Sequence, residues 1–448
     1  MLTNKRDSGQ MSFYSTFEEQ LNHNHSLYIL AKQVRWQIFE EAFWKHYSQT
    51  MGAPAKPIRL MVGLLILKHL RNLSDESVVG QWAENAYYQY FCGEKVFAAQ
   101  EPCVPTELVE FRKRIGEEGI ELILQESIHI NGKDAQDKDG LIDTTVQEKN
   151  ITFPTDTKLH KKIIKRCKEI ASKENIELRQ SYTKTVKKLS MEQRFRHHPK
   201  NYKKAVRADR RIKTIAGRLV RDVERKLPPS TKYQTDLELF KKVLMQKRHD
   251  TQKIYSLHEP HVQCISKGKE HKKYEFGSKV SIITTKDTGV IIGAINIAKN
   301  DYDAHTLLPA IEQQQRLTGH VLENGIVDRG YRGIKNVFGT NILIPNGVKA
   351  KTSYQKSKLR KAFRRRASIE PKIGHIKSDH RLARNFYKGI VGDNINVMLA
   401  AAAMNFKRMM NKWKQQGYIF VEFLTQLLIG FSPPSINFKK LLASKITF

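Results

Sequence analysis

The chain has 448 residues and a mass of 51.9 kDa, more than one ordinary domain holds, so two or three domains are expected. Lys and Arg outnumber Asp and Glu by 78 to 45, while hydrophobic residues still make up 40% of the chain. This composition excludes a single small module and a disordered chain, and it indicates a folded, strongly basic protein.

The cysteines and the apolar runs exclude further classes of protein. The four cysteines lie far apart with no C-x-x-C spacing, which argues against a disulfide scaffold and against zinc fingers. The first residues lack the apolar core of a signal peptide, and the longest apolar runs are too short to cross a membrane. We therefore expect a cytoplasmic protein with no membrane partner.

The positive charge is concentrated in two blocks. Residues 157–226 hold 24 Lys and Arg against 7 Asp and Glu, and residues 349–388 hold 14 against 2. Residues 1–125 are close to neutral, with 13 basic and 15 acidic side chains. Solvated helix faces could explain the blocks, but a footprint for nucleic acid is the favoured interpretation because neutralised phosphates release counterions. The expected DNA contacts in the first block are Arg207, Arg210 and Arg211.

The N-terminal part has a helical pattern from about residue 12 to residue 127. Pro57 begins a run dense enough in apolar residues for a buried helix, and Ser74 is a predicted N-cap. The two helices could form a helix-turn-helix, although periodicity favours an ordinary bundle.

The pattern then changes to strands around a basic helical segment. LIDTTVQEKNI, which contains Asp143, has the alternation of a strand, and residues 156–227 are helical up to Pro228-Pro229. Strands are predicted in KIYSLHEP, in HVQCISKG and on both sides of a hairpin turn at residues 286–289. A helix, a short strand that ends at Asp328, another strand and a helical C-terminal segment to about Lys414 follow.

Three acids are placed where an acid is unexpected. Asp143 lies inside an apolar strand, Asp328 follows one, and Glu370 stands alone in a basic helix. Singly, each is better explained as a cap or a salt-bridge partner. Together, three hard oxygen ligands beside a basic surface suit Mg²⁺, which binds carboxylates and phosphate oxygens.

Spacing around Glu370 supports this interpretation. At 100° per residue, Phe363, Arg366, Glu370 and Lys377 share a sector about 60° wide, so an acid would be flanked by two phosphate-binding cations. Pro371 disfavours helical geometry at Glu370, and the helix either kinks or begins anew there.

Three other groups of residues are candidate ligands or DNA contacts. Asp301 and Asp303 could be ligands, but Asp303 precedes a helical run and is better read as a cap. A zinc pair of His375 and His380 is disfavoured because the two do not share a helical face. The basic run 349–366 could be solvated, although its continuity with Glu370 favours DNA contact.

These motifs resemble those of a known family. Phe363-x2-Arg366-x3-Glu370-x6-Lys377 is similar to the Y-x2-R-x3-E-x6-K signature of bacterial insertion-sequence DDE transposases, in the group called the insertion-sequence four and five families. IVDRGYRG and LIDTTV resemble the family's two aspartate motifs, and NFYKGIVGDNINVMLAAAAMNFKRM resembles its C-terminal helix. LRNLSDESVVGQWAENAYYQYFCGE resembles the helical domain that often precedes the catalytic one, so the resemblance covers nearly the whole chain.

The resemblance implies a fold and a reaction. It implies an RNase H-like fold, Mg²⁺-dependent DNA cleavage and strand transfer, and a homodimer on the terminal inverted repeats of a bacterial element. Asp143, Asp328 and Glu370 carry over as catalytic metal ligands, and Arg366 and Lys377 as phosphate-binding residues. Phe363 departs from the family's Tyr and has no hydroxyl for a phosphate.

The full interpretation is a mixed α/β protein that acts as a cut-and-paste transposase on double-stranded DNA, associated with the nucleoid. Two Mg²⁺ ions, replaceable by Mn²⁺, would serve the phosphoryl transfer. The alternatives are a nuclease of the same fold without strand transfer and a catalytically idle DNA-binding protein. We expect an all-α N-terminal domain (1–130), a catalytic domain (131–410) with a basic helical insertion at about 156–230, and a C-terminal tail (411–448).

Overall fold

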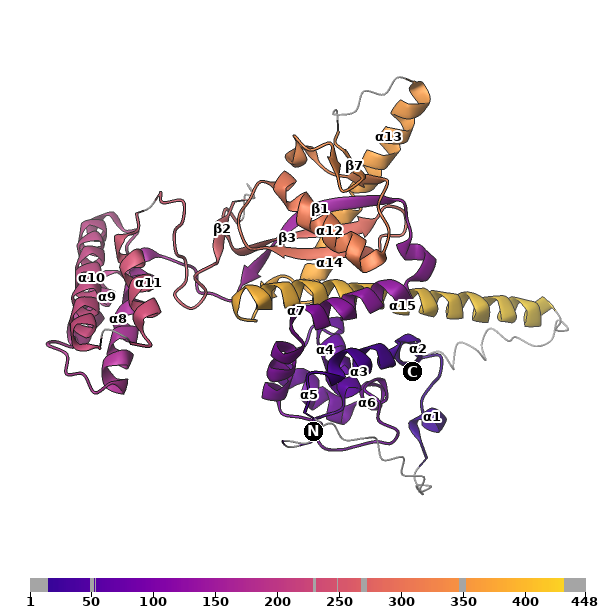
Figure 1. The fold of residues 1–448 in the computed structure, drawn as a ribbon, viewed down its shortest axis with the longest axis horizontal. Coiled ribbons are helices and arrows are strands. Elements are labelled where there is room, and N and C mark those ends of the chain that lie inside the picture. The colour runs from indigo at the N-terminus through magenta and orange to yellow at the C-terminus, as the bar shows by residue number, and fades with distance from the viewer. Residues whose placement is uncertain are drawn as a thin grey trace.

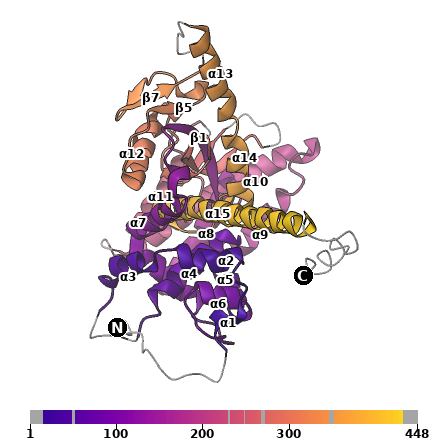
Figure 2. The same ribbon diagram turned by 90° about the vertical axis from the view of Figure 1, so that its right-hand side faces the viewer.

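The computed structural model describes residues 15–48, 52, 54–228, 231–247, 249–266, 272–345 and 352–430, with side chains as far as residue 417 in the last helix. Lys349 and Lys351 of the second basic block, the start of the chain and residues 431–448 of the expected tail lie outside them. The long helix α15 (Gly389–Gly430) separates the N-terminal helices from a mixed sheet, and a further group of helices stands to one side (Figure 1). The view in Figure 2 shows the same separation by α15.

The N-terminal region is helical, as predicted. The Ser74 hydroxyl accepts a hydrogen bond from the Ser77 N–H at 3.0 Å, which confirms the expected N-cap. The apolar run after Pro57 forms a helix that is buried on all sides against α15 and its neighbours, so it is a bundle helix. The helices are α1 (Phe17–Gln20), α2 (Ser26–Gln33), α3 (Trp36–Trp44), α4 (Ile58–Leu70), α5 (Asp75–Glu84), α6 (Ala86–Phe91) and α7 (Pro105–Ile130).

The sheet is mixed, also as predicted. Its order is β2-β3-β1-β5-β7-β6, with β4 on β3 and β8 on β1. The first strand runs antiparallel to β3 and parallel to β5, and the expected hairpin turn joins β3 to β4. The strands are β1 (Asp139–Lys149), β2 (Gln263–Ile265), β3 (Glu275–Thr285), β4 (Ile291–Ile297), β5 (Asn324–Ile326), β6 (Asn336–Val337), β7 (Thr340–Leu343) and β8 (Arg384–Asn385).

The two faces of the sheet are covered by different helices. Ile142 of β1 belongs to the main hydrophobic core, together with side chains of α15 and of α12 (Leu307–Thr318). Leu141, the next residue back, faces the other way and packs with Ile326 and Ile369. This second face is covered by α13 (Ser353–Arg366) and α14 (Ile369–Asp379). Alternation along β1 therefore decides which residues α13 and α14 meet.

The basic insertion forms a helical unit with its own hydrophobic core (Figure 1). Its longest helix is strongly amphipathic: Ile212, Ile215 and Leu219 are buried, and the arginines lie on the opposite side. Helical structure continues beyond the expected limit at about 230. The helices are α8 (Asp156–Lys173), α9 (Thr183–Glu192), α10 (Pro199–Lys226) and α11 (Gln234–Met245).

One predicted strand is wrong. Residues 253–260 form no strand, although Ile254 and Ser256 are buried in alternation as a strand would require. The Gln246 side chain takes the place of a partner strand, because its amide accepts from the Ile254 N–H at 3.0 Å and donates to the Ile254 carbonyl at 3.2 Å. Alternating burial thus arose from packing beside α11.

The C-terminal helix is longer than expected. It was predicted to end near Lys414, but α15 continues to Gly430. Its first half is buried against the sheet and the N-terminal helices, which gives both parts one continuous core. Within the described residues, no helix is long and apolar enough to span a membrane.

Two buried histidines lie where α4 meets the chain between α14 and α15. The His69 ring is fully buried and hydrogen-bonds Asn396 at 3.3 Å, and His380 hydrogen-bonds the His69 carbonyl at 3.0 Å. Burial lowers the pKa of both rings, and the nearby Lys68 charge lowers that of His69 further.

Acid should therefore destabilise the fold. Because the folded pKa values lie below the ordinary 6.5, the stability that depends on the neutral rings is present above pH 6.5 and is lost as the pH falls. Each ring should contribute at most about 1.4 kcal/mol per pH unit. Urea unfolding at pH 7.5 and 5.5 measures this. His69→Gln should reduce the difference, whereas His197→Gln, at an exposed ring, should not; an equal pH dependence in both variants would contradict the assignment.

Candidate active site

Asp143 lies in β1, and Asp328 lies at the same level, two residues beyond the end of the neighbouring parallel strand β5. The register pairs Leu141 with Ile326, and each aspartate follows its own strand residue by two positions. The chain stays extended as far as Val327, whose N–H bonds the Leu343 carbonyl at 3.1 Å. Because side chains alternate, both carboxylates belong to the sheet face that α13 and α14 cover.

Local contacts hold both carboxylates. One oxygen of Asp143, Oδ1, accepts from the Thr144 N–H at 2.8 Å. Asp328 Oδ1 accepts from the Gly330 N–H at 2.7 Å and so caps the short helix η3 (Arg329–Tyr331). Asp328 therefore caps a helix, which is the alternative role that the sequence allowed. It also lies at the level of Asp143.

Arg366 lies between Asp143 and Glu370. Its Nη1 is 3.7 Å from Asp143 Oδ2, and its Nη2 is 3.2 Å from Glu370 Oε1. The helix breaks at this point: α13 ends at Arg366 and α14 begins at Ile369, with Pro371 in its first turn. Pro371 allowed either a kink or a new helix start, and the structure has a new helix start. Arg366 and Glu370 still meet across the break.

Asp303 is the residue that sequence reasoning misassigned. It does not act as a cap: its Oδ1 accepts from the Thr144 hydroxyl at 3.1 Å and from Lys279 Nζ at 2.9 Å. Lys279 lies in β3, and Thr144 lies in β1, directly after Asp143. The helix η2 (Asp303–Thr306) that carries this acid packs against η3 beside Asp328. No signal in the sequence near Asp303 indicates these partners, because both come from distant strands.

A buried tyrosine lies within reach of the charges of three acids. Tyr331 is fully buried, and its pKa is raised well above the ordinary value by burial and by the charges of Asp143, Asp303 and Asp328. Carboxylates from β1, from η2 and from the end of β5 thus all raise the pKa of the same hydroxyl. The phenol of Tyr331 is therefore held in its protonated form.

The donor set suits a divalent cation by its chemistry. Carboxylate oxygens are the ligands that Mg²⁺ prefers. Among the described residues, however, no group of three or more His, Cys, Asp or Glu side chains is arranged to hold a metal ion. At this site Arg366 supplies the positive charge between Asp143 and Glu370, and Glu370 is 62% exposed. That the three acids share metal ions stays a prediction.

The remaining signature residues have separate positions. Phe363 is half-buried against Leu141, Ile326 and Ile369, so an apolar ring here anchors α13 to the sheet. Lys377 is half-buried in the last turn of α14. His375 bonds Asp379 at 3.2 Å, while His380 is buried against α4, so the two do not form a zinc pair.

Two exposed basic surfaces flank the sheet. Arg207, Arg210 and Arg211 all lie on the exposed side of α10. The helix α13 projects from the sheet (Figure 1). It has no buried residue, and its sequence is rich in lysine and arginine. Each surface faces solvent, as a DNA-contacting surface must.

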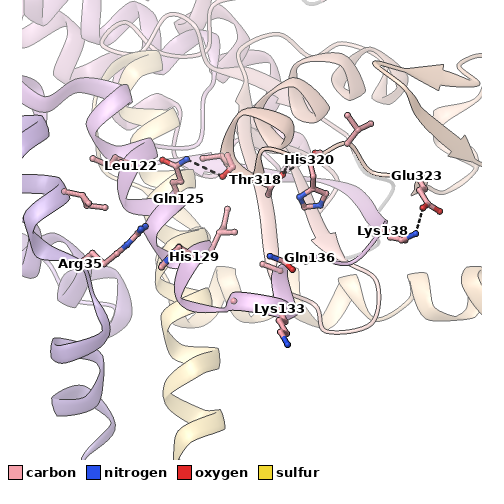
Figure 3. A pocket seen from close by; sticks show the side chains of 16 residues that line it. Arg35, Leu122, Gln125, His129, Lys133, Gln136, Lys138, Thr318, His320 and Glu323 are labelled. Carbon is pink, nitrogen blue, oxygen red and sulfur yellow. Dashed lines mark hydrogen bonds and ion pairs between the residues drawn. The ribbon is translucent and has the colours of Figure 1, made fainter.

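One cavity of the described structure lies away from the acids. It measures about 990 Å³ and is bounded by α7, α12 and the chain that leads into β1, with Arg35, His129 and Lys138 around it (Figure 3). Glu323, its acid, bonds Lys138 at 2.9 Å. This cavity lies beside the amino ends of β1 and β5, before the chain reaches Asp143 and Asp328, and it brings no carboxylate cluster together.

Comparisons with known proteins identify the family. Residues 15–114 match the family model described as "Transposase domain (DUF772)", and residues 344–410 match "Transposase DDE domain", which includes Arg366 and Glu370. The chain is 38% identical over 187 residues to "Uncharacterized protein ORF8 in nfe locus" of Rhizobium meliloti, across 41% of this chain and 90% of that protein. No solved structure matches significantly. With both transposase models matched in order, the chain belongs to the DDE-type insertion-sequence transposases.

Proposed function

We propose that the protein is a cut-and-paste transposase that binds the terminal inverted repeats of its element, cleaves DNA with Mg²⁺ and joins the strands. The observation that carries the proposal is the position of Asp143 and Asp328 at one level of two parallel strands, with Arg366 and Glu370 beside them. The family membership supports the same reaction.

An RNase H-like catalytic fold is part of this proposal. It is supported by the antiparallel strands β4, β3 and β1 and by β5 and β7 running parallel to β1. The N-terminal helices would bind element ends and contact a second copy of the chain, and the insertion would hold DNA flanking the catalytic face. The limits 1–130, 131–410 and 411–448 stay predictions, whereas the helices of the insertion extend to Met245 and α15 runs across residue 410.

The chemistry would be shared between a metal and this chain's own groups. Asp143, Asp328 and Glu370 would hold two Mg²⁺ ions, which Mn²⁺ could replace; bound metal would lower the pKa of the attacking hydroxyl and stabilise the leaving oxygen. Arg366 is placed to exchange its two carboxylates for a DNA phosphate, and Lys377 would bind a neighbouring phosphate. Lys279 and Thr144 would hold Asp303 beside the acids.

The test uses the purified full chain and a duplex that carries one element end, taken from the DNA flanking the reading frame. Cleavage at the end followed by joining to a target duplex, in Mg²⁺ but not in EDTA, is the expected result. Cleavage without joining would make the protein a nuclease. Tight binding without cleavage would make it an idle DNA-binding protein.

DNA affinity should depend steeply on salt through the insertion. Replacing Arg207, Arg210 and Arg211 by Ala should lower the slope of log affinity against log salt by about 2 to 3, because each lost phosphate contact removes about 0.9. Fluorescence anisotropy at several salt concentrations measures this slope. Lys133→Ala/Lys138→Ala, at exposed lysines near the cavity of Figure 3, is the control. An unchanged slope in the triple variant would mean that these arginines contact no phosphate in the complex.

A further inference from the structure

The break between α13 and α14 carries two of the proposed site residues. α13 ends at Arg366 and α14 begins at Ile369, which Glu370 follows directly. A turn spans the break, in which the Ser368 N–H donates to the Arg365 carbonyl at 3.0 Å. Short breaks at the ends of elements are where chains hinge. The position of Arg366 relative to Glu370 therefore depends on the angle at which the two helices meet.

The hairpin turn between β3 and β4 contacts both helices at this break. Arg365, in the last turn of α13, donates from Nε to the Lys286 carbonyl at 3.1 Å and from Nη2 to the Asp287 carbonyl at 2.6 Å. Lys372, near the start of α14, donates from Nζ to the Gly289 carbonyl at 2.7 Å. The turn therefore holds one helix on each side of the break.

The turn is itself fixed to the rest of the fold. Arg408 of α15 donates from Nε to the Thr288 carbonyl at 3.3 Å and from Nη2 to Asp134 at 2.7 Å. Asp137 accepts a hydrogen bond from the Asp287 N–H at 2.7 Å. All four carbonyls of the turn thus accept hydrogen bonds from cationic side chains, and such charge-assisted bonds are stronger than neutral ones. The turn is therefore a firm support for α13 and α14.

Apolar packing holds the two helices unequally. α14 buries Ile369 and Ile376, whereas α13 buries no side chain and its Phe363 is half-buried. The two helices follow one another towards α15 (Figure 2), and α13 is the one that carries Arg366. Because α13 has the weaker apolar anchor, the bonds of Arg365 to the turn are the contacts best placed to set its direction.

We propose that the hairpin turn is a splint that fixes the angle between α13 and α14, and that Arg365 and Lys372 are positioning residues for Arg366 and Glu370. Groups that act on a phosphate must be held closely, and a misplacement of about 1 Å can cost about a hundredfold in rate. Arg365 belongs to the second basic block, so contact with DNA is the alternative role, and the two roles predict different results. The proposal rests on the DNA-cleaving function proposed above.

The test compares neighbouring arginines of α13 in the full chain, with a duplex that carries an element end. Arg365→Ala should lower the single-turnover cleavage rate at saturating DNA by at least about tenfold. Arg364→Ala removes the same charge from an exposed side chain that bonds no other described residue, and it should cleave like the parent. Both variants should weaken DNA binding, measured by anisotropy, by the same factor. Arg365→Lys should restore the affinity but only part of the rate, because lysine lacks the planar fork that reaches two carbonyls.

A second pair of variants opens the splint without any change of charge. A Cβ at Gly289 would overlap the Lys372 ammonium, so Gly289→Ala displaces Lys372 from the turn. Gly289 and Gly319 have similar positive φ values, +69° and +71°, but a Cβ at Gly319 would enter open space. Both Ala variants should therefore lose similar stability through backbone strain, as measured by urea unfolding, and Gly289→Ala alone should cleave more slowly at saturating DNA.

The outcomes separate the splint from the proposed function. If Arg365→Ala cleaves as fast as Arg364→Ala, or loses rate only in step with DNA affinity, the inference is overturned while the proposed function stands. Equal cleavage by Gly289→Ala and Gly319→Ala would overturn the positioning role of Lys372. A parent protein that binds element ends without cleaving them would overturn both the inference and the proposed function.

Discussion

Glu370→Gln should lower Mg²⁺-dependent cleavage by about three orders of magnitude or more and leave binding to DNA ends intact. Gln keeps the size of the side chain and the hydrogen bond from Arg366, but it removes the charge that a metal ligand needs. Affinity for DNA could only gain, because a negative charge close to phosphates is lost. The measurement is single-turnover cleavage of an end-bearing duplex beside an anisotropy titration.

A purely structural role for Glu370 predicts a different cleavage rate for the variant. If Glu370 only pairs with Arg366 on the surface of α14, an exposed pair four residues apart contributes about 0.3 to 0.5 kcal/mol, and cleavage would hardly change. A variant that cleaves as fast as the parent would therefore remove Glu370 from the mechanism.

Two comparison variants separate charge loss from loss of structure. Asp379→Asn removes an exposed carboxylate from the same helix, where it pairs with His375, and should cleave like the parent. Lys377→Ala should weaken both cleavage and binding, since a phosphate-binding cation acts in the ground state and in the transition state. Equal losses in Glu370→Gln and Asp379→Asn would indicate a general effect of charge on α14.

Local patterns in the sequence were enough to place the elements that carry the acids. Alternation in LIDTTV predicted a strand around Asp143, and the apolar GIV before Asp328 predicted the next one. The hydroxyl at Ser74, followed by two acids, predicted a helix start that the structure has. Each of these signals lies within a few residues of the feature that it predicts, where backbone geometry decides the outcome.

Contacts between distant segments could not be predicted in the same way. The partners of Asp303 are Lys279 and Thr144, which are 24 and 159 residues away, and nothing near Asp303 in the sequence indicates them. The bridge from Arg366 to Asp143 likewise exists only because β1 packs under α13 and α14. The predicted strand around Ile254 is wrong for a related reason. A glutamine side chain, and not a neighbouring strand, accepts the hydrogen bond from the Ile254 N–H.

A group of four polar side chains, Lys149, Glu259, His261 and Asp393, holds the insertion to the sheet. Lys149, at the end of β1, contacts Asp393 at 2.6 Å and Glu259 at 3.3 Å, and His261 contacts the same two acids at 3.1 and 3.4 Å. The lysine and the two acids are at most 5% exposed. The chain leaves for the insertion after Lys149 and returns at Glu259, so both crossings are fixed to the first turns of α15 at one point.

Lys149→Met should therefore lower the free energy of unfolding by about 3 to 5 kcal/mol. Methionine preserves much of the volume, but two buried carboxylates lose their shared cation, and an uncompensated buried charge costs that much. Urea unfolding followed by circular dichroism measures the loss. Lys388→Met, at an exposed lysine of the neighbouring loop, should change stability by less than about 0.5 kcal/mol.

The double variant Lys149→Met/Asp393→Leu distinguishes the origin of the loss. Replacing both charges by apolar groups removes the unpaired carboxylate, so the double variant should recover part of the stability that Lys149→Met loses. Additive losses would mean that packing, not charge, decides stability at this point. The same four residues set where the insertion leaves the sheet. The recovered double variant should therefore bind DNA through α10 but cleave element ends more slowly than the parent. Cleavage at the parent's rate would show that the insertion needs no fixed anchor.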